Sequence, residues 1–331
     1  MRDPSLPVRR GLVLGGGGVL GAAWTAGALR ALEERLGMDA RDFDHVLGTS
    51  AGAVFAALIG SGVPASDLLQ HQLGQPLVSG PFVGFVWDYD TATGPERPPR
   101  PKPGLGSSTM LRSRARQLRH LPPTAVLAAL LPEGRGRLDA VGDLVAHVTP
   151  TGWARRPGIG IVALDYDTGH RAVFGRPGSP EADLPRAVMA SCAIPMWYEP
   201  VVIDGDRYVD GGVWSSTNLD LMTGLDLDEV YVLAPMVSFV KWTPKPLGDR
   251  IAQRWRYRVT LRCLRELEKV RSEGTKVTVL GPGEEDLVAI GNNPMDVARR
   301  PGVVETSVRT SRAALDNPIL LPEPIQFEDV G

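Results

Sequence analysis

Hydrophobic positions along the chain form short buried runs that alternate with segments of helical spacing. The apolar run over residues 11–14 is followed by residues 21–36, where Trp24, Ala28 and Leu32 share one helical face. A second run over 45–47 is followed by small residues over 51–59 that favour a helix. Two successive strand–turn–helix units predict the start of a parallel α/β sheet.

The same periodicities predict further elements along the rest of the chain. Strands are expected over 160–165, 170–174, 230–233 and 276–280, and a strand or turn over 200–209. Helices are expected over 109–118, 124–131, 138–147, 184–192, 250–271 and 303–315. Asp204-Gly205 is typical of a hairpin turn, so the strand around it should fold back on itself.

The regular pattern stops between residues 75 and 150. Residues 92–106 are rich in proline and glycine, which predicts a mobile loop. Phe82, Phe85, Trp87 and Tyr89 lie just before it, either as core residues, the commoner role, or as an acyl-binding lid. We therefore expect one α/β domain over 8–320, with 75–150 inserted as a partly helical cap.

Composition narrows the class of protein. The 331 residues contain 43% hydrophobic and 22% charged residues, which is typical of a globular protein. Only two cysteines occur, so neither a disulfide framework nor a cysteine-built metal site is expected. A net charge of -2 argues against nucleic-acid binding. No apolar run is long enough to span a bilayer, which predicts a cytoplasmic protein with at most peripheral membrane contact.

The glycine cluster at Gly15–Gly21 presents backbone N–H groups at the start of a helix, where negative charge is favoured. Three ligands fit this arrangement: a dinucleotide pyrophosphate, a nucleotide phosphate or an oxyanion. Gly16, Gly18 and Gly21 match the dinucleotide pattern, but the next strand ends in Gly-Thr-Ser without the acidic residue that binds ribose. A P-loop is excluded because no lysine precedes Lys102.

The second chemical motif is Gly48-Thr49-Ser50-Ala51-Gly52, at the turn from a strand to a helix. A serine in this pattern is either a helix N-cap or a nucleophile held on a sharp turn. The glycine cluster upstream favours the nucleophile, since both turns would lie at one edge of the sheet.

Ser50 needs a general base, and the histidines are poorly placed to supply one. The last of the five is His170, although a Ser-Asp-His triad has its histidine late in the chain. A carboxylate can act instead. Asp210, in Tyr208-Val209-Asp210-Gly211-Gly212, is the best candidate, although an ordinary Asp-Gly turn is the simpler interpretation of that segment alone.

Three blocks, Gly15–Gly21, Gly48–Gly52 and Asp210–Gly212, together resemble the signature motifs of the patatin-like phospholipase family. The stretch from Ala190 to Val201 is similar to the segment that precedes the family's aspartate. The resemblance covers about residues 10–221. It implies a three-layer α/β/α fold with a mainly parallel sheet, and hydrolysis of lipid acyl esters without metal or cofactor.

Carried over residue by residue, the resemblance implies Ser50 as nucleophile, Asp210 as base, and the backbone of Gly16, Gly17 and Gly18 as the oxyanion hole. The supporting glycines are Gly15, Gly21, Gly48, Gly52, Gly211 and Gly212. The sequence departs from the family's pattern at two positions, and these bear on the substrate rather than on the catalytic groups. Leu20 stands where the family often has Arg or Lys, and Asn218 lacks the proline that often follows it.

The expected function is therefore a serine acyl hydrolase acting on a lipid or acyl-ester substrate, of phospholipase A, lysophospholipase or esterase type. Two alternatives are a catalytically silent lipid-binding protein on the same fold and a dinucleotide-binding oxidoreductase. Residues 250–265 contain six arginines and no acidic residue, which fits an anionic lipid surface or, more commonly, a solvated helix face.

Overall fold

The computed structural model describes residues 7–85, 87–88, 99–113, 121–150, 152–240 and 247–317. Side chains of 247–249 and 251 are not described. The strands are β1 (Arg10–Leu14), β2 (His45–Thr49), β3 (Ile159–Asp165), β4 (Arg171–Phe174), β5 (Val201–Ile203), β6 (Asp206–Asp210), β7 (Glu229–Leu233) and β8 (Lys276–Leu280). The helices are α1 (Gly18–Leu36), α2 (Ala51–Gly60), α3 (Ala65–Gln72), α4 (Ser108–Ser113), α5 (Pro123–Leu130), α6 (Asp139–Val148), α7 (Leu184–Cys192), α8 (Leu247–Arg271), α9 (Glu284–Ile290) and α10 (Arg300–Asp316).

One mixed sheet forms the centre of the molecule, in the order β5-β6-β3-β2-β1-β7-β8, with β4 also paired to β3. The five strands from β3 to β8 in that order are parallel, whereas β4 and β6 run antiparallel to β3, and β5 to β6. Because β1 lies between β2 and β7, the turns that follow these three strands meet at one edge of the sheet.

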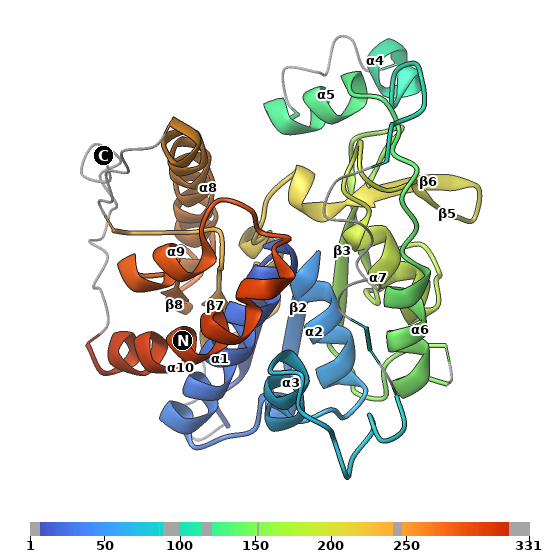
Figure 1. Cartoon of the computed structure of the whole chain (residues 1–331). Coiled ribbons are helices and arrows are strands. Elements are labelled where there is room, and N and C mark those ends of the chain that lie inside the picture. Colours follow the sequence, from blue (N-terminus) through green and yellow to red (C-terminus); the bar gives the residue numbers. More distant parts are fainter. Residues whose placement is uncertain are drawn as a thin grey trace.

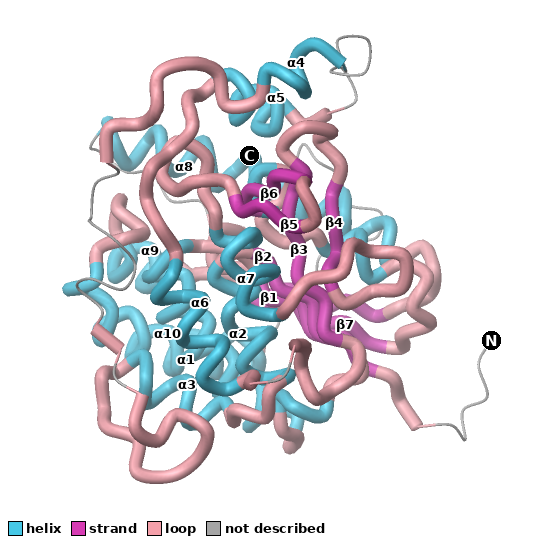
Figure 2. Tube along the Cα trace, turned by 90° about the vertical axis from the view of Figure 1, so that its right-hand side faces the viewer, coloured by secondary structure: helices cyan, strands magenta, loops and turns pink. Residues whose placement is uncertain are grey.

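Helices cover both faces of the sheet, since strand side chains alternate between the faces. On one face Leu12 and Leu14 of β1 pack with α1, α2, α6, α7 and α10. On the other face Val13 packs with Cys263, Leu264 and Leu267 of α8. Figure 2 shows the strands as a single sheet with α1, α2 and α10 on one side. The predicted three-layer α/β/α fold is confirmed.

The segment 75–150, predicted as a cap, has two different environments in the structure. Leu144 and Val145 of α6 belong to the main core beside α7. Helices α4 and α5 instead surround a small separate cluster with Tyr166 and Val209, and they lie at the top of Figure 1, beyond the end of β3. Residues 92–98 of the predicted proline-rich loop lie outside the described residues.

Candidate active site

Ser50 lies at the sharp turn between β2 and α2, with φ 54° and ψ −123°. A non-glycine residue rarely adopts a positive φ, and such strain collects at functional sites. The turn requires glycines on either side of the serine. A Cβ on Gly52 would lie 2.0 Å from the Leu14 carbonyl oxygen, and one on Gly48 would lie 2.5 Å from the Gly52 carbonyl oxygen. The predicted nucleophile turn therefore has the backbone that its motif indicates.

The buried hydroxyl of Ser191 supports this turn through two hydrogen bonds. The Ser50 N–H donates to the Ser191 Oγ at 2.9 Å, and the Ser191 hydroxyl donates to the Val162 carbonyl oxygen at 2.6 Å. Ser191 is fully buried at the end of α7. It comes from the stretch that resembles the segment before the family's aspartate, but the sequence alone does not reveal what its side chain contacts.

Asp210 ends β6, and its N–H is tied to the Ala193 carbonyl oxygen at 3.0 Å. Its carboxylate accepts a hydrogen bond from the Gly212 N–H at 2.7 Å, and the Ser50 hydroxyl lies close enough to lower the pKa of the carboxyl. Only 5% of Asp210 is exposed, and this burial raises the pKa of its carboxyl to about 6, although the Ser50 hydroxyl and the Gly212 N–H act in the opposite direction. The structure thus brings together the hydroxyl and the carboxylate that the sequence places 160 residues apart.

Asn218 links the two chemical segments, and the sequence analysis gave it no role. It is fully buried, and its side-chain NH₂ donates to the Thr49 hydroxyl and the Gly211 carbonyl oxygen, at 3.2 and 3.3 Å. Thr49 precedes Ser50, and Gly211 follows Asp210. The Asn218 amide therefore fixes the two turns relative to each other. Asn218 is also one of the few non-glycine residues with positive φ, a conformation that asparagine tolerates well.

The glycine cluster stands beside Ser50 at the start of α1. A Cβ on Gly16 would lie 3.0 Å from the Ser50 Cβ, so a side chain there would crowd the nucleophile. The Gly16 N–H, however, donates to the Ser216 carbonyl oxygen at 2.9 Å. The Gly16 N–H, which was predicted to bind the oxyanion, is therefore already hydrogen-bonded, and our proposal does not use it as an oxyanion donor.

Gly17 and Gly18 occupy the N-cap and first position of α1, where helical N–H groups have no partner within the helix. Among the described backbone hydrogen bonds, neither N–H donates to another residue, whereas the Leu20 N–H donates to the Pro294 carbonyl oxygen. Leu20 itself is fully buried in the core, so it supplies no charge at the position where the family often has a basic residue.

The other supporting glycines allow close backbone packing around these turns. A Cβ on Gly211 would lie 2.4 Å from the Val162 carbonyl oxygen, and one on Gly212 would lie 2.9 Å from the Asp210 carboxylate. Gly15 packs against the Leu233 carbonyl oxygen and Gly21 against Pro235. These glycines allow the backbone of the site to adopt its shape, but they supply none of its reacting groups.

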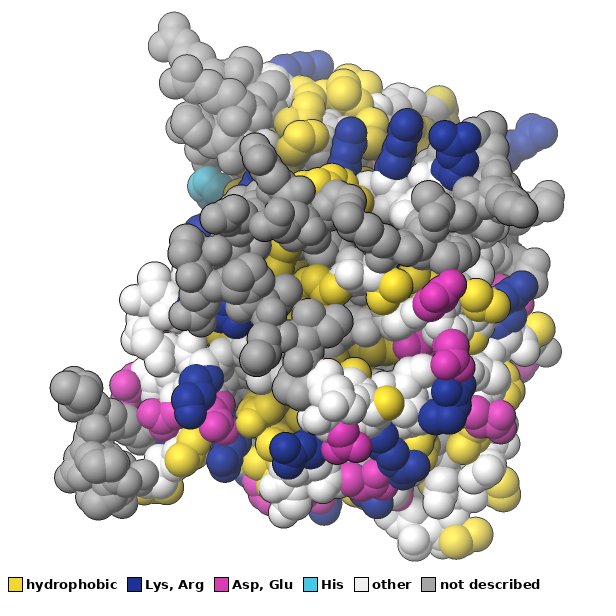
Figure 3. Space-filling view, turned by 90° about the vertical axis from the view of Figure 1, so that its left-hand side faces the viewer, with side chains coloured by type: hydrophobic (Ala, Val, Ile, Leu, Met, Phe, Trp, Pro, Cys, Tyr) yellow, Lys and Arg dark blue, Asp and Glu magenta, His cyan; other side chains and the backbone are white. Residues whose placement is uncertain are grey.

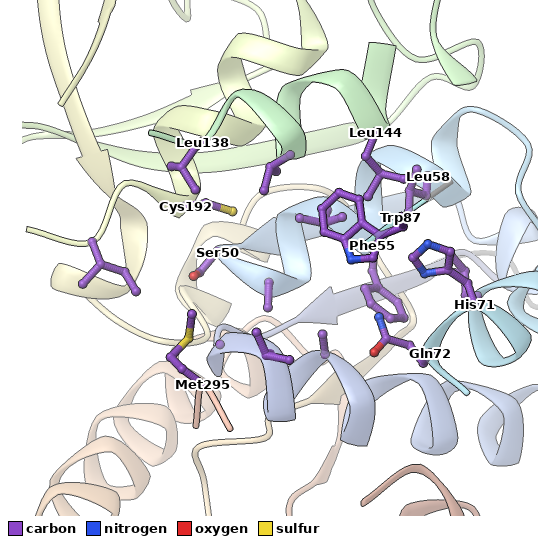
Figure 4. A pocket seen from close by; sticks show the side chains of 18 of the residues that line it. Ser50, Phe55, Leu58, His71, Gln72, Trp87, Leu138, Leu144, Cys192 and Met295 are labelled. Atoms are coloured by element: carbon purple, nitrogen blue, oxygen red, sulfur yellow. The ribbon is translucent and has the colours of Figure 1, made fainter. Parts of the chain in front are cut away.

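A largely apolar pocket of about 110 Å³ extends from Ser50 into the core. Helices α1, α2 and α6 supply most of its wall, with Val19, Ala22, Val54, Phe55, Leu58, Val141 and Leu144. Figure 4 shows Ser50 at one end and Phe55, His71 and Gln72 at the other. Trp87, from the predicted aromatic cluster, also lines the pocket, whereas Phe82 is buried in the core. Tyr89 lies outside the described residues.

Neither a histidine nor a thiol competes with the Ser50–Asp210 pair within the described part of this pocket. His71 lies at the end away from Ser50, stacked on Phe82, and burial lowers its pKa to about 4. Cys192 lies closer, but burial raises the pKa of its thiol well above the ordinary value, so it is protonated at neutral pH. Among the described residues, no cluster of three or more His, Cys, Asp or Glu side chains could hold a metal ion.

Comparison with known proteins settles the family. The model of the patatin-like phospholipase family matches residues 12–223, more than half of the chain. The chain belongs to the patatin-like phospholipase family. Membership assigns it to a family of enzymes that hydrolyse lipid esters, and it gives no support to the dinucleotide oxidoreductase considered from the glycine cluster. A search of curated protein sequences finds no match.

Among solved structures, the search matches bacterial proteins of low sequence identity. VipD from Legionella pneumophila is 15% identical with a TM-score of 0.45, and the match covers 94% of this chain and 67% of VipD. The type III effector ExoU is 18% identical with a TM-score of 0.35, covering 94% of this chain and 53% of ExoU. The heterodimeric ExoU–SpcU complex from the type III secretion system of Pseudomonas aeruginosa gives 19% identity, a TM-score of 0.30, and coverage of 94% and 61%. This chain thus spans between about half and two thirds of their lengths.

Proposed function

We propose that the protein hydrolyses acyl esters of lipids with a two-residue machinery, in which Ser50 is the nucleophile and Asp210 the general base. The observation that carries the proposal is the closeness of the Ser50 hydroxyl, on its sharp turn, to the buried Asp210 carboxylate at the end of an apolar pocket. The pocket suits an acyl chain, because it removes apolar surface from water next to the reacting carbonyl.

In the first step, the Ser50 Oγ attacks the ester carbonyl carbon while the Asp210 carboxylate accepts the hydroxyl proton. The negative charge on the carbonyl oxygen is stabilised by the N–H groups of Gly17 and Gly18, and by the positive end of α1. The carbon–oxygen bond to the alcohol then breaks, and protonated Asp210 returns its proton to that leaving group.

The second step releases the fatty acid from the acyl-enzyme. Asp210, again ionised, accepts a proton from a water molecule that attacks the Ser50 ester. The tetrahedral intermediate collapses, the proton returns to the Ser50 Oγ, and the free acid leaves. The two steps consume one water and regenerate the enzyme, and they require no cofactor.

The sequence analysis also made two predictions about where the protein acts, one about membrane contact and one about location. Among the described residues no helix is both long and apolar enough to cross a membrane. We propose that the protein contacts lipid surfaces only peripherally. The cytoplasmic location expected from the sequence stays a prediction.

Release of fatty acid from phosphatidylcholine and from lysophosphatidylcholine tests the proposed function. The wild-type protein should release acid from at least one of these lipids, and Ser50→Ala should reduce the rate by at least about 10³-fold, because it removes the nucleophile. Ser61→Ala is a suitable control, since Ser61 is equally buried but lies at the far end of α2. A wild-type protein that binds these lipids without turnover would instead be the silent lipid-binding protein.

A further inference from the structure

The first half of α8 presents a stripe of arginines to solvent. Arg250, Arg254 and Arg258 are exposed and recur every fourth residue, so they lie on one side of the helix. Arg265 continues the same side, and no acidic residue occurs between Arg250 and Arg265. Figure 3 shows a row of basic side chains across the upper part of this face of the molecule, with no acidic side chain visible among them.

Arg250, Arg254 and Arg258 have no ion pair with any carboxylate whose side chain the structure describes, unlike several other arginines of the protein. Arg262 on the same helix is paired with Glu266, and Arg312 of α10 is paired with Glu34. No described carboxylate forms an ion pair with Arg250, Arg254 or Arg258, so their charge is available to a ligand.

Two aromatic side chains flank the stripe. Trp255 is 43% exposed and Tyr257 is 39% exposed, so a large part of each apolar side chain is open to solvent. Tryptophan and tyrosine rings with adjacent cationic side chains are typical of helices that lie in the interface between a lipid bilayer and water. A surface that attracts only soluble polyanions needs the arginines but not the exposed rings.

This helix face lies at the same edge of the sheet as Ser50. Helix α8 joins the parallel neighbours β7 and β8, so it starts at the carboxyl ends of the strands. The Arg256 side chain donates to the Pro235 carbonyl oxygen at 2.8 Å. The ring of Pro235 in turn packs against Gly17 of the glycine cluster. Two contacts therefore connect helix α8 to the glycine cluster beside Ser50.

We propose that Arg250, Arg254, Trp255, Tyr257 and Arg258 form the surface by which the protein docks on an anionic lipid membrane, here called the α8 face. The arginines pair with lipid phosphates and carboxylates, and the two rings enter the headgroup region. Docking in this way presents the edge that carries Ser50 to the lipid. The inference rests on the proposed function for its purpose, but membrane binding itself does not require turnover.

Co-sedimentation with vesicles tests the α8 face in the Ser50→Ala background, so that hydrolysis cannot alter the lipid. The protein should bind vesicles of phosphatidylcholine and phosphatidylserine, bind phosphatidylcholine alone much more weakly, and lose binding as salt rises. The triple variant R250Q/R254Q/R258Q should reduce partition to the anionic vesicles by about 100-fold, since each arginine near such a surface contributes about fivefold.

A matched control makes the same change of charge at the opposite edge of the sheet. Arg35 ends α1, Arg155 precedes β3 and Lys276 begins β8, and all three are exposed. The variant R35Q/R155Q/K276Q should bind anionic vesicles as the parent does. Equal losses in both triple variants would overturn the proposal, because net charge alone would then explain binding.

The aromatic pair separates a membrane from any other polyanion. W255A/Y257A should weaken vesicle binding by at least about tenfold, since each buried ring contributes apolar transfer energy. Undiminished vesicle binding by this variant would refute the α8 face as a lipid-docking surface. Hydrolysis of a soluble butyryl ester by the same variants with Ser50 intact should be unchanged. Failure of that soluble activity in the unmodified protein would refute the proposed function and leave the binding result standing.

Discussion

The Asp210 carboxyl has opposite effects on catalysis and on stability. Its pKa is about 6 in the folded protein, against an ordinary value of 3.8, because burial disfavours the charged form. The pKa is raised by folding, so the stabilising contribution is complete below the unfolded value and is lost as pH rises through about 6. At neutral pH the raised pKa therefore makes the folded protein about 3 kcal/mol less stable than it would be if Asp210 kept its ordinary pKa.

Asp210→Asn should consequently abolish activity without weakening the fold. The amide cannot accept the Ser50 proton, so kcat should fall by at least about 10³-fold. Its oxygen can still accept the Gly212 N–H, and no charge is buried, so the melting temperature at pH 8 should equal or exceed that of the wild type. Calorimetry and an ester assay on one preparation check both outcomes. A large drop in melting temperature would mean that Asp210 is structural.

The pH dependence of hydrolysis follows from the same group. A general base works only when ionised, so kcat/KM for a soluble ester should rise with pH through about 6 and then stay level to about pH 8. His71 has a pKa of about 4 and lies far from Ser50, so it does not contribute to this inflection. A profile that is flat from pH 4 to 8 would argue against Asp210 as the base.

At the scale of elements, the role of the start of α1 in the reaction can be tested with two glycines of nearly equal φ. Gly18 has φ 65° and Gly37, at the other end of α1, has φ 63°. A Cβ at Gly18 would meet the Met295 Sδ at 3.0 Å and the Pro294 carbonyl oxygen at 3.1 Å, whereas a Cβ at Gly37 meets nothing within 4 Å.

Gly18→Ala should therefore displace the predicted oxyanion donors and lower kcat by about 10²-fold. Gly37→Ala should destabilise the protein by about 1 kcal/mol through its positive φ, and leave kcat unchanged. Steady-state kinetics and thermal unfolding of both variants give the comparison. Equal kcat values would show that the α1 start does not take part in the reaction.

Helix α6 should set the length of the acyl chain, because Leu144 lines the pocket away from Ser50. Leu144→Trp fills that part of the pocket, and each excluded methylene forfeits about 0.8 kcal/mol. The ratio of kcat/KM for decanoyl over butyryl p-nitrophenyl esters should fall by at least about tenfold. The ratio cancels any general damage to the site. An unchanged ratio would place the acyl chain elsewhere.

Local sequence signals predicted helices and strands well where capping residues, proline or glycine mark their ends. The predicted helix 184–192 coincides with α7, where Asp183 caps the start and Pro185 occupies the first turn. The strand over 276–280 coincides with β8, and Asp204-Gly205 forms the predicted hairpin turn. Helix α3 was not predicted, because Pro64 precedes it and supplies no capping side chain.

The contacts between distant segments could not be predicted in the same way. Ser50 and Asp210 were proposed as partners from motif order and from the absence of a suitable histidine, and the fold places them together. Nothing local in the sequence indicates that Ser216 occupies the Gly16 N–H, that Ser191 holds Ser50, or that Asn218 joins the two turns. Each of these bonds joins residues more than a hundred positions apart, except one between Asn218 and Gly211.

At the scale of the whole molecule, the topology explains why so few residues make the site. Strands β1, β2 and β7 are neighbours, so the glycine cluster, Ser50 and the Pro235 loop converge at one edge of the sheet. The antiparallel β6 pairs with Ala163–Asp165 of β3, directly beyond the residues of β3 that pair with β2, and so brings Asp210 next to the end of β2. The pocket, by contrast, depends on α1, α2 and α6, which lie on one face.

The rate of covalent labelling of Ser50 by a fluorophosphonate tests the central claim most directly. The reagent reacts with an activated serine, and peptide mass spectrometry identifies the modified residue. We expect one label, on Ser50, with a rate that rises with pH through about 6 and falls by at least about 10³-fold in Asp210→Asn. Labelling of Ser50 at the same rate in Asp210→Asn, or labelling of a different residue, would contradict the account.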